Sequence, residues 1–332
     1  MAITRSFDPG VSQRTEVYAA VKMLEAAAPV IVLDRLGSTQ PMPKNKGTTI
    51  VWRRARPFAP IKVPLEEGVT PNATQFRYDD VPARLQQYGQ VVEVTDVIED
   101  THEDPVLNDA AEKAGENIGR TIEALTFGTL IGGTSVFYAN GSVRTAVNTA
   151  ITLNKIRAVV RFLQAQKAMP ITRILDSSVK YATRWVEGGY IAVAHTDLAP
   201  DIRNIAGFLP VAAYGTRTLV HPNELGTVEN VRFILSPDFT NWPGGGGAVN
   251  GMVSSDASKA DVYPVLFFGR DAFGTVPLRG EGAVEPTIIR SNVRTKDDPL
   301  GQRGYVGWKT WHAAAILNQL WMARLEVSAT AL

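Results

Sequence analysis

The chain has 332 residues, of which 45% are hydrophobic and 20% charged, with a formal net charge of +1. This composition can bury a sizeable core and argues against disorder, and the near-neutral balance is unlike the basic excess of a duplex-binding protein. There are no cysteines, so disulfides, thiolate metal sites and cysteine nucleophiles are excluded.

The N-terminal residues are predicted to form an arm. The opening residues lack the apolar core of a signal peptide, and no apolar run approaches the roughly 18 residues of a membrane span. Apolar residues from Val17 to Ala27 recur at helical spacing, and Pro29 ends the run. Residues 30–43 show no clear period and indicate an arm or linker.

Two strands joined by a long connection are predicted next. Thr48–Arg56 and Tyr88–Glu99 are rich in β-branched and aromatic residues. The residues between them include five prolines and have no strong helical period. Connections this long are uncommon inside compact domains and tend to be functional or extended. We predict a projecting two-stranded loop that lies over a neighbouring subunit; an ordinary surface loop is the alternative.

A long helix is predicted from Pro105 to Ile131. Apolar residues step by three and four, Asp104 is a natural N-cap, and Gly132 follows the last turn. Gly115 and Gly119 stand four residues apart inside it. Small residues let another backbone approach closely, so we expect close packing at this pair; a harmless weakness of the helix is the alternative.

The second half of the chain has the short alternating segments of a mixed α/β domain. Expected strands are Ser135–Tyr138, Ile171–Asp176, Tyr190–His195 and Val262–Phe268, and expected helices are 152–168, Ser178–Glu187 and Asp197–Ala206. Residues 241–260 have the composition of a flexible loop. Residues 304–317 fit a strand, and the clean alternation over Trp321–Ser328 predicts a half-buried closing strand.

Motifs for chemistry are weak. Gly244–Gly247 lacks the Gly-Lys-Ser/Thr ending of a phosphate loop, and Gly280 and Gly282 lack the third glycine of a dinucleotide fingerprint. His195, Asp197 and Asp201 are metal-ligand types, but Asp197 reads better as a helix N-cap. No catalytic residue, cofactor or metal site is therefore predicted. A glycosidase with paired carboxylates stays open, because such acids need not be near in sequence.

Charge is divided into two opposite blocks. Residues 44–64 carry six basic residues and no acid, and residues 93–109 carry seven acids and no lysine or arginine. Such blocks invite pairing within or between chains; two solvated faces, or a nucleic-acid patch around Trp52, are the alternatives. The predicted contacts between subunits join three arginines to five acids: Arg53, Arg54 and Arg56 with Glu99, Asp100, Glu103, Asp104 and Asp109.

Four blocks of sequence carry a family resemblance. They are QYGQVVEVTDVIEDTHEDPVLNDAAEKAGENIGRTIE, HTDLAPDIRNIAGFLPVAAY, NELGTVENVRFILSPDF and DPLGQRGYVGWKTWHAAAILNQLWMARLEV. Together they cover most of residues 85–330 and resemble the N-four-like major capsid family of tailed bacteriophages. The resemblance implies an α+β protein of the Hong Kong-type phage capsid fold.

That fold implies a division of the chain into five parts. They are an N-terminal arm (1–45), an E-loop or extended β-hairpin (46–100), a P domain with a spine helix (101–150), an A domain (151–285) and C-terminal strands returning to the P domain (286–332). Because few residues precede the first loop strand, a separate scaffolding protein is expected. No crosslinking lysine and asparagine can be placed by motif.

The function implied is a major capsid protein without enzymatic activity. Its copies are expected to assemble as hexamers and pentamers into an icosahedral head that encloses double-stranded DNA. Further expected partners are a scaffolding protein, a portal and a decoration or cement protein. The expected location is the virion, after assembly in the host bacterial cytoplasm. An encapsulin-type shell protein and an α/β enzyme acting on nucleotides or sugars are the alternatives.

Overall fold

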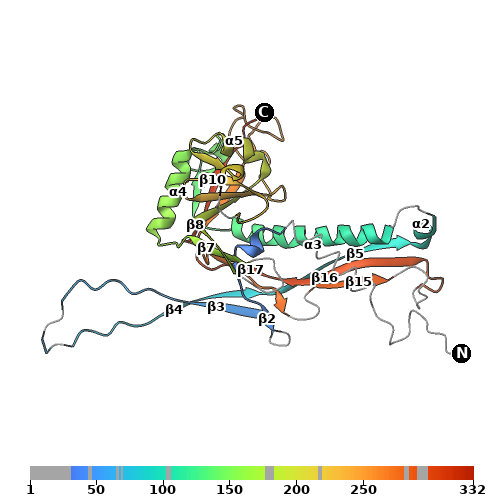
Figure 1. Ribbon diagram of the computed structural model, residues 1–332, viewed down its shortest axis with the longest axis horizontal. Helices are drawn as coiled ribbons and strands as arrows, with labels where there is room; N and C mark the ends of the chain where they lie inside the picture. The colour runs from blue at the N-terminus through green and yellow to red at the C-terminus, as the bar shows by residue number, and fades with distance from the viewer. Residues whose placement is uncertain are drawn as a thin grey trace.

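The computed structural model describes residues 31–43, 47–64, 67–68, 70–101, 106–175, 183–215, 219–279, 284–289 and 298–332. Figure 1 shows an elongated base, a compact α/β unit above it and a long hairpin that projects from one end of the base. The expected helix near residues 17–27 lies outside the described residues.

The helices among the described residues are α2 (Asp96–Thr101), α3 (Val106–Ile131), α4 (Leu153–Ala165) and α5 (Ala199–Arg203), with the short 3₁₀ helices η1 (Leu33–Arg35), η2 (Arg144–Ala146), η3 (Thr196–Leu198) and η4 (Val211–Ala213). The strands up to residue 194 are β1 (Ser38–Thr39), β2 (Met42–Pro43), β3 (Thr49–Ala55), β4 (Tyr78–Arg84), β5 (Gln86–Thr95), β6 (Val136–Tyr138), β7 (Ile171–Leu175) and β8 (Thr183–Ala194). The later strands are β9 (Phe208–Pro210), β10 (Glu224–Val228), β11 (Val231–Leu235), β12 (Tyr263–Phe268), β13 (Phe273–Thr275), β14 (Leu278–Arg279), β15 (Val284–Ile289), β16 (Arg303–His312), β17 (Ala314–Ile316) and β18 (Met322–Val327).

The projecting hairpin is closed by β4 and not by the strand that the sequence suggested. β3 pairs antiparallel with β4, from Thr49 opposite Arg84 to Ala55 opposite Tyr78. Proline lacks an N–H group, yet Pro82 is tolerated because each strand of a two-stranded ribbon has a free edge. The expected pairing of Thr48–Arg56 with Tyr88–Glu99 is therefore wrong, and the loop is a hairpin within the longer segment.

The base consists of a three-stranded sheet with α3 packed along it. β5 and β15 both pair antiparallel with β16, and β16 matches β5 over its whole length. Ala111, Ala114 and Ile118 of α3 pack on Val306 and Trp308 of β16. Figure 1 shows the helix and these strands running side by side. The predicted long helix is therefore confirmed, and it lies along the base.

The end of β5 differs from the expected strand, which was to continue to Glu99. The chain instead turns into α2 at Asp96. The Asp96 carboxylate accepts a hydrogen bond from the Val97 N–H at 2.8 Å, and the Asp96 N–H donates to the Gln302 carbonyl at 3.0 Å. Aspartate competes with the sheet for local backbone donors, which favours a helix start over a continuing strand.

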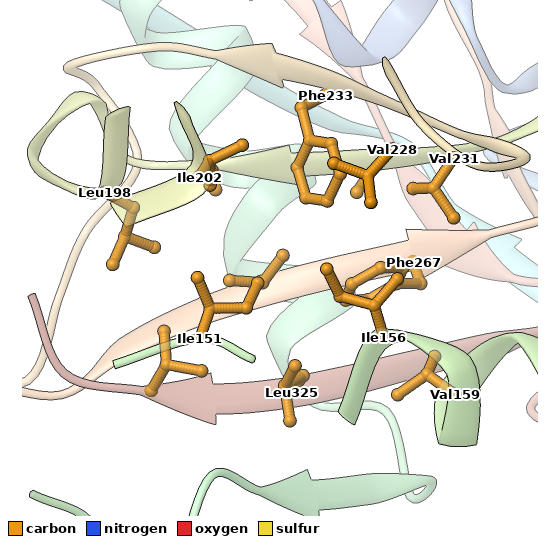
Figure 2. Close-up of a cluster of buried hydrophobic side chains, with 14 of the residues drawn as sticks. Ile151, Ile156, Val159, Leu198, Ile202, Val228, Val231, Phe233, Phe267 and Leu325 are labelled. Atoms are coloured by element: carbon orange, nitrogen blue, oxygen red, sulfur yellow. The ribbon is translucent and has the colours of Figure 1, made fainter. Parts of the chain in front are cut away.

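The α/β unit is built on one mixed sheet in the order β6-β18-β12-β8-β11-β10-β9, with β7 paired to β8. Helix α4 covers one face, and Figure 2 shows Ile156 and Val159 of this helix beside Leu325 and Phe267 of the sheet. The C-terminal turns of α3 pack against the opposite face through residues such as Phe127. Buried apolar residues on both faces explain why this unit is compact.

Three local expectations about the α/β unit are corrected. The strand β18 is buried on both faces and not half-buried, because it lies between β12 and β6 with packed residues above and below. Thr183–Glu187, expected within a helix, belongs to β8, where β-branched and aromatic residues favour a strand; residues 176–182 lie outside the described residues. The Gly-rich segment is packed: the Gly246 N–H bonds the Ala260 carbonyl and the Gly247 N–H bonds the Val147 carbonyl.

Candidate assembly surfaces

The stem of the β3–β4 hairpin carries ion pairs within one chain. Arg53 and Asp80 face each other across the two strands, with 2.9 Å between Nε and Oδ1. Arg54 and Arg56 both pair with Asp79, at 3.3 and 2.6 Å. The Arg56 guanidinium beside Asp79 holds the pKa of that carboxyl below its usual range. These pairs fix the register of the hairpin.

The sequence reasoning missed Asp79 and Asp80 as partners. A signal was present, because the acidic pair at 79–80 stands opposite the basic pair at 53–54 when the two strands are folded back. All of these side chains keep substantial exposure, from 29% to 63%. The arginines therefore have room for a second acidic neighbour, and the pairing between subunits stays a prediction.

The predicted acidic partners lie at the opposite end of the base. Asp109 is exposed in the first turn of α3. The backbone of Glu99 and Asp100 lies in α2, whereas Glu103 and Asp104 lie outside the described residues. Figure 1 places α2 and the start of α3 at the end of the base remote from the hairpin. The structure thus separates the two charge blocks within one chain.

The outer part of the hairpin exposes large apolar side chains. Phe58, Ile61 and Val63 are 58%, 83% and 76% exposed. On the returning side Phe76 contacts Phe58 with ring centroids 5.8 Å apart, and Tyr78 edge-on at 4.6 Å. These aromatic contacts stiffen the hairpin, while the aliphatic side chains face solvent. Exposed apolar surface on a projection of this kind marks an interaction site.

A groove of about 410 Å³ lies at the other end of the base, between β5, α2 and the start of α3. Its wall includes Val92, Ile98, Val106 and Ala110, and its polar residues are Glu93, Asp109 and Lys113. Val92 and Ile98 are 40% and 44% exposed. The molecule therefore has an apolar projection at one end and an apolar depression at the other, which suits a head-to-tail contact between copies.

The glycine pair of α3 lies on the covered side of the helix. Gly115 and Gly119 are both buried, whereas Gly128 in the same helix is exposed. The helix packs against β16, β17 and η1. Burial agrees with a site of close packing, and the identity of the element seated on the two glycines stays a prediction.

Trp52 does not offer a free ring beside the arginines. Its indole packs with Ile50 and Ala83 in a small cluster and approaches Gly274, where a built Cβ would meet Cζ2 at 2.8 Å. The indole N–H is buried. A base needs an accessible aromatic face on which to stack, so this packing argues against the nucleic-acid interpretation of the basic block.

The candidate metal residues make structural hydrogen bonds. His195, and not Asp197, is the N-cap of η3, because its Nδ1 accepts from the Asp197 N–H at 3.1 Å. The Asp197 carboxylate accepts from the Tyr263 hydroxyl at 2.8 Å, and Asp201 accepts from Thr330 at 2.6 Å. Among the described ranges there is no group of three or more potential metal ligands. Within the same residues no helix is long and apolar enough to cross a membrane.

Comparison with known proteins adds a sequence family. A family model described as phage capsid protein matches residues 78–325. A major capsid protein from Pseudomonas phage KPP21 is 21% identical over 195 residues, which are 54% of this chain and 49% of that protein. The chain thus spans about half the length of this curated relative.

Solved structures agree on the fold. The capsid of Ralstonia phage GP4 is similar with a TM-score of 0.63 and 15% identity, covering 99% of this chain and 98% of its own. The capsid subunit of cyanophage Pam1 also gives 0.63, at 13% identity and 92% coverage of both chains. These likenesses confirm the expected fold over almost the whole chain.

Proposed function

The chain belongs to the phage capsid protein family, and from this premise we propose that it is a major capsid protein whose copies build an icosahedral phage head. The observation that carries the proposal is the family match over residues 78–325, which includes the base, the long helix and the α/β unit. The protein acts by assembly and not by catalysis.

The division into an arm, E-loop, P domain and A domain is part of the proposal. The strand pairing supports an E-loop made of β3 and β4, with β5 assigned to the P domain beside β16 and α3. The A domain includes β18, because this strand lies in the sheet of the α/β unit next to β12. The C-terminal segment then crosses from the P domain into the A domain.

Neighbouring copies meet head to tail in this proposal. The hairpin tip of one copy lies in the groove beside α3 of the next, so that Ile61 and Val63 leave water against Val92 and Ile98. A contact between two different faces closes a ring when the rotation between copies permits, as hexamers and pentamers require.

Charge supports the same orientation. Lys62 stands exposed at the tip, and Asp109 stands exposed at the groove; in the described part of the chain neither has an ion-pair partner. Complementary charge of this kind favours the correct encounter more than it adds affinity.

The remaining partners follow from the function. We propose that the assembled shell encloses double-stranded DNA without reading its sequence, and that a scaffolding protein, a portal and a decoration or cement protein complete the head. The location is then the virion, after assembly in the host cytoplasm. An encapsulin-type shell is the second candidate, and the contents of native particles separate the two: DNA supports the phage head and packaged enzyme supports the compartment.

The direct test is electron microscopy of the purified full-length protein over a range of salt concentrations, with and without its scaffolding protein. Shells, tubes or rings of five or six copies are expected. A small species that never assembles under any of these conditions contradicts the proposal.

The head-to-tail contact is tested with Ile61→Asp plus Val63→Asp, which places charge on the apolar tip. We expect loss of shells with retained folding. The matched control is Val143→Asp, because Val143 is 51% exposed but lies away from both the hairpin and the groove. Equal assembly of the tip variant and the parent would show that the tip is not in the contact.

A further inference from the structure

The first described residues, 31–37, are seated on α3 and are here named the arm root. Val32 and Leu33 are fully buried and pack in a cluster with Phe127 and Leu130 of the helix. Phe273 of β13 belongs to the same cluster. The arm root is therefore held to the helix by apolar packing.

A carboxylate of the helix adds a polar anchor. Glu123, one turn before Phe127, is fully buried and accepts hydrogen bonds from the N–H groups of Val32 and Leu33, each at 3.1 Å. A buried backbone N–H without a partner is costly, so these two donors depend on Glu123. The segment and the helix are separated by about 90 residues in sequence, as the contact of Leu33 with Glu123 shows.

A second acid enters the same buried site. Asp34 directly follows the anchored Leu33; the residue is half-buried, and its Oδ1 is buried with no hydrogen-bond partner. Asp34 and Asp238 are the charges that act on Glu123, and both are negative. Like charges that interact away from water are unfavourable, so the pair retains protons to a higher pH than exposed acids do.

Burial raises the pKa of Asp34 to about 7 and that of Glu123 to about 8, although hydrogen bonds from Thr126 and from the Val32 and Leu33 N–H groups act in the opposite direction. The two groups interact, so their titration belongs to the pair. The ordinary pKa values of these two carboxyls lie near 4. The interval between the ordinary and the raised pKa values is the pH range in which the site exchanges protons with solvent.

Of the other ionisable groups near the site, the two histidines titrate below this pH range, which leaves it to the carboxyl pair. Thr126 bonds His312 of β16 at 2.9 Å, and burial lowers the pKa of His312 to about 4. Burial and the nearby Arg35 lower the pKa of His221 to about 4 as well. Asp238 pairs with Arg120 of α3 at 3.5 Å. Both histidines are therefore neutral above pH 5.

We propose that Asp34 and Glu123 form a proton-dependent latch that seats the arm root on α3 while the pair holds protons and releases it when both carboxyls are ionised. The released root exposes both acids to water, where they ionise freely. Proton loss therefore favours release of residues 31–37 from α3. The latch is internal to one chain, so it does not depend on the proposed function.

The direction in which pH shifts the opening of the arm root follows from proton linkage. The seated state binds protons up to about pH 8, and the released state loses them near pH 4. Opening is therefore expected to increase about tenfold per pH unit for each titrating carboxyl between these limits, and to level off above pH 8. An arm root held by apolar packing alone would open independently of pH.

The test is hydrogen exchange of the full-length protein, followed by mass spectrometry of peptides covering residues 31–37 between pH 5.5 and 9. After correction for the intrinsic exchange rate, exchange in the parent should rise with pH up to about pH 8 and stay constant above it. The double variant Asp34→Asn, Glu123→Gln keeps an acceptor for one of the N–H donors but cannot titrate, and its profile should be flat.

Two further variants make the result decisive. Glu116→Gln removes a partly exposed acid of the same helix, which pairs with Lys113, and should keep the slope of the parent. Asp34→Asn alone leaves the Glu123 anchor intact; its slope below about pH 7 should fall to about half that of the parent, because Glu123 still titrates, even if the double variant does not fold. A flat profile in the parent, or a parent-like slope in the folded Asp34→Asn variant, overturns the latch.

Discussion

Arg144 donates two hydrogen bonds, of 2.8 and 2.9 Å, from its Nε and Nη2 groups to the fully buried carboxylate of Glu326. The guanidinium also lies 3.5 Å from the ring centroid of Trp242. Arg324 also pairs with Glu326, with 2.9 Å between its Nε and Oε1, and donates to the Ile131 carbonyl at the end of α3. This cluster joins the long helix of the base to the sheet of the α/β unit.

Replacing Arg144 with alanine should destabilise the fold by about 2 kcal/mol, because the buried Glu326 carboxylate loses two charge-assisted hydrogen bonds while its pair with Arg324 remains. Urea unfolding of the full-length subunit measures the change. Arg157→Ala is the control: Arg157 and Glu229 form an exposed pair, with 56% and 44% exposed side chains, so its loss should cost no more than about 1 kcal/mol. Equal losses in the two variants would contradict a structural role for the Arg144 cluster.

Reversing Arg53 and Arg54 to glutamate should weaken assembly, because both the hairpin pairs and the predicted contact with the next subunit are lost. Each exposed pair contributes about 0–1 kcal/mol, but the contact is repeated around a shell. Light scattering at low and high salt measures the concentration needed for assembly, and the effect should shrink as salt screens the charges.

Two second-site changes separate the roles of these arginines. Reversing Asp79 and Asp80 to arginine restores the pairs of positions 53 and 54 within the hairpin, although Arg56 then faces an arginine at position 79, and should not restore assembly. Reversing Asp109 in the arginine variant should recover part of the assembly if the arginines themselves, and not only the hairpin tip, reach the start of α3. Full recovery by the Asp79 and Asp80 changes alone would show that the arginines only hold the hairpin together.

Leucine at both Gly115 and Gly119 should impair folding or assembly, since both positions are buried and the added side chains have to displace whatever packs there. Solubility and particle yield measure the effect. Gly128→Leu is the matched control in the same helix: the position is exposed, and a Cβ built there has no neighbour within 4 Å. Normal particles from the double variant would refute the close-packing prediction.

Acid should destabilise the fold through its buried histidines. His312 stays neutral in the folded chain to about pH 4, whereas an unfolded histidine takes a proton near pH 6.5. The contribution to stability is thus present above pH 6.5 and is lost as the pH falls to about 4, by up to about 3 kcal/mol. Urea unfolding of His312→Gln should show a smaller decline over this range. An unchanged decline would mean that His312 does not stay neutral.

Much of the architecture was visible in the sequence. The helix stripe before Gly132 predicted α3 and its end at Ile131, because local periodicity and a glycine stop are properties of neighbouring residues. The pairing partner of β3 was not visible. β4 and β5 follow one another almost without a break, and local pattern does not distinguish them. β16, which lies more than 200 residues later in the chain, pairs with β5. β4 is therefore left to pair with β3 in the hairpin.

The charge blocks were also visible, and they located the arginines of the hairpin and the exposed Asp109. Their partners Asp79 and Asp80 required the strand register, which depends on where the hairpin closes. The roles of Glu123 and Asp34 required the tertiary structure entirely. By sequence alone they are two ordinary acids about 90 residues apart. Only packing removes them from water, and removal from water is what makes a carboxyl sensitive to its neighbour.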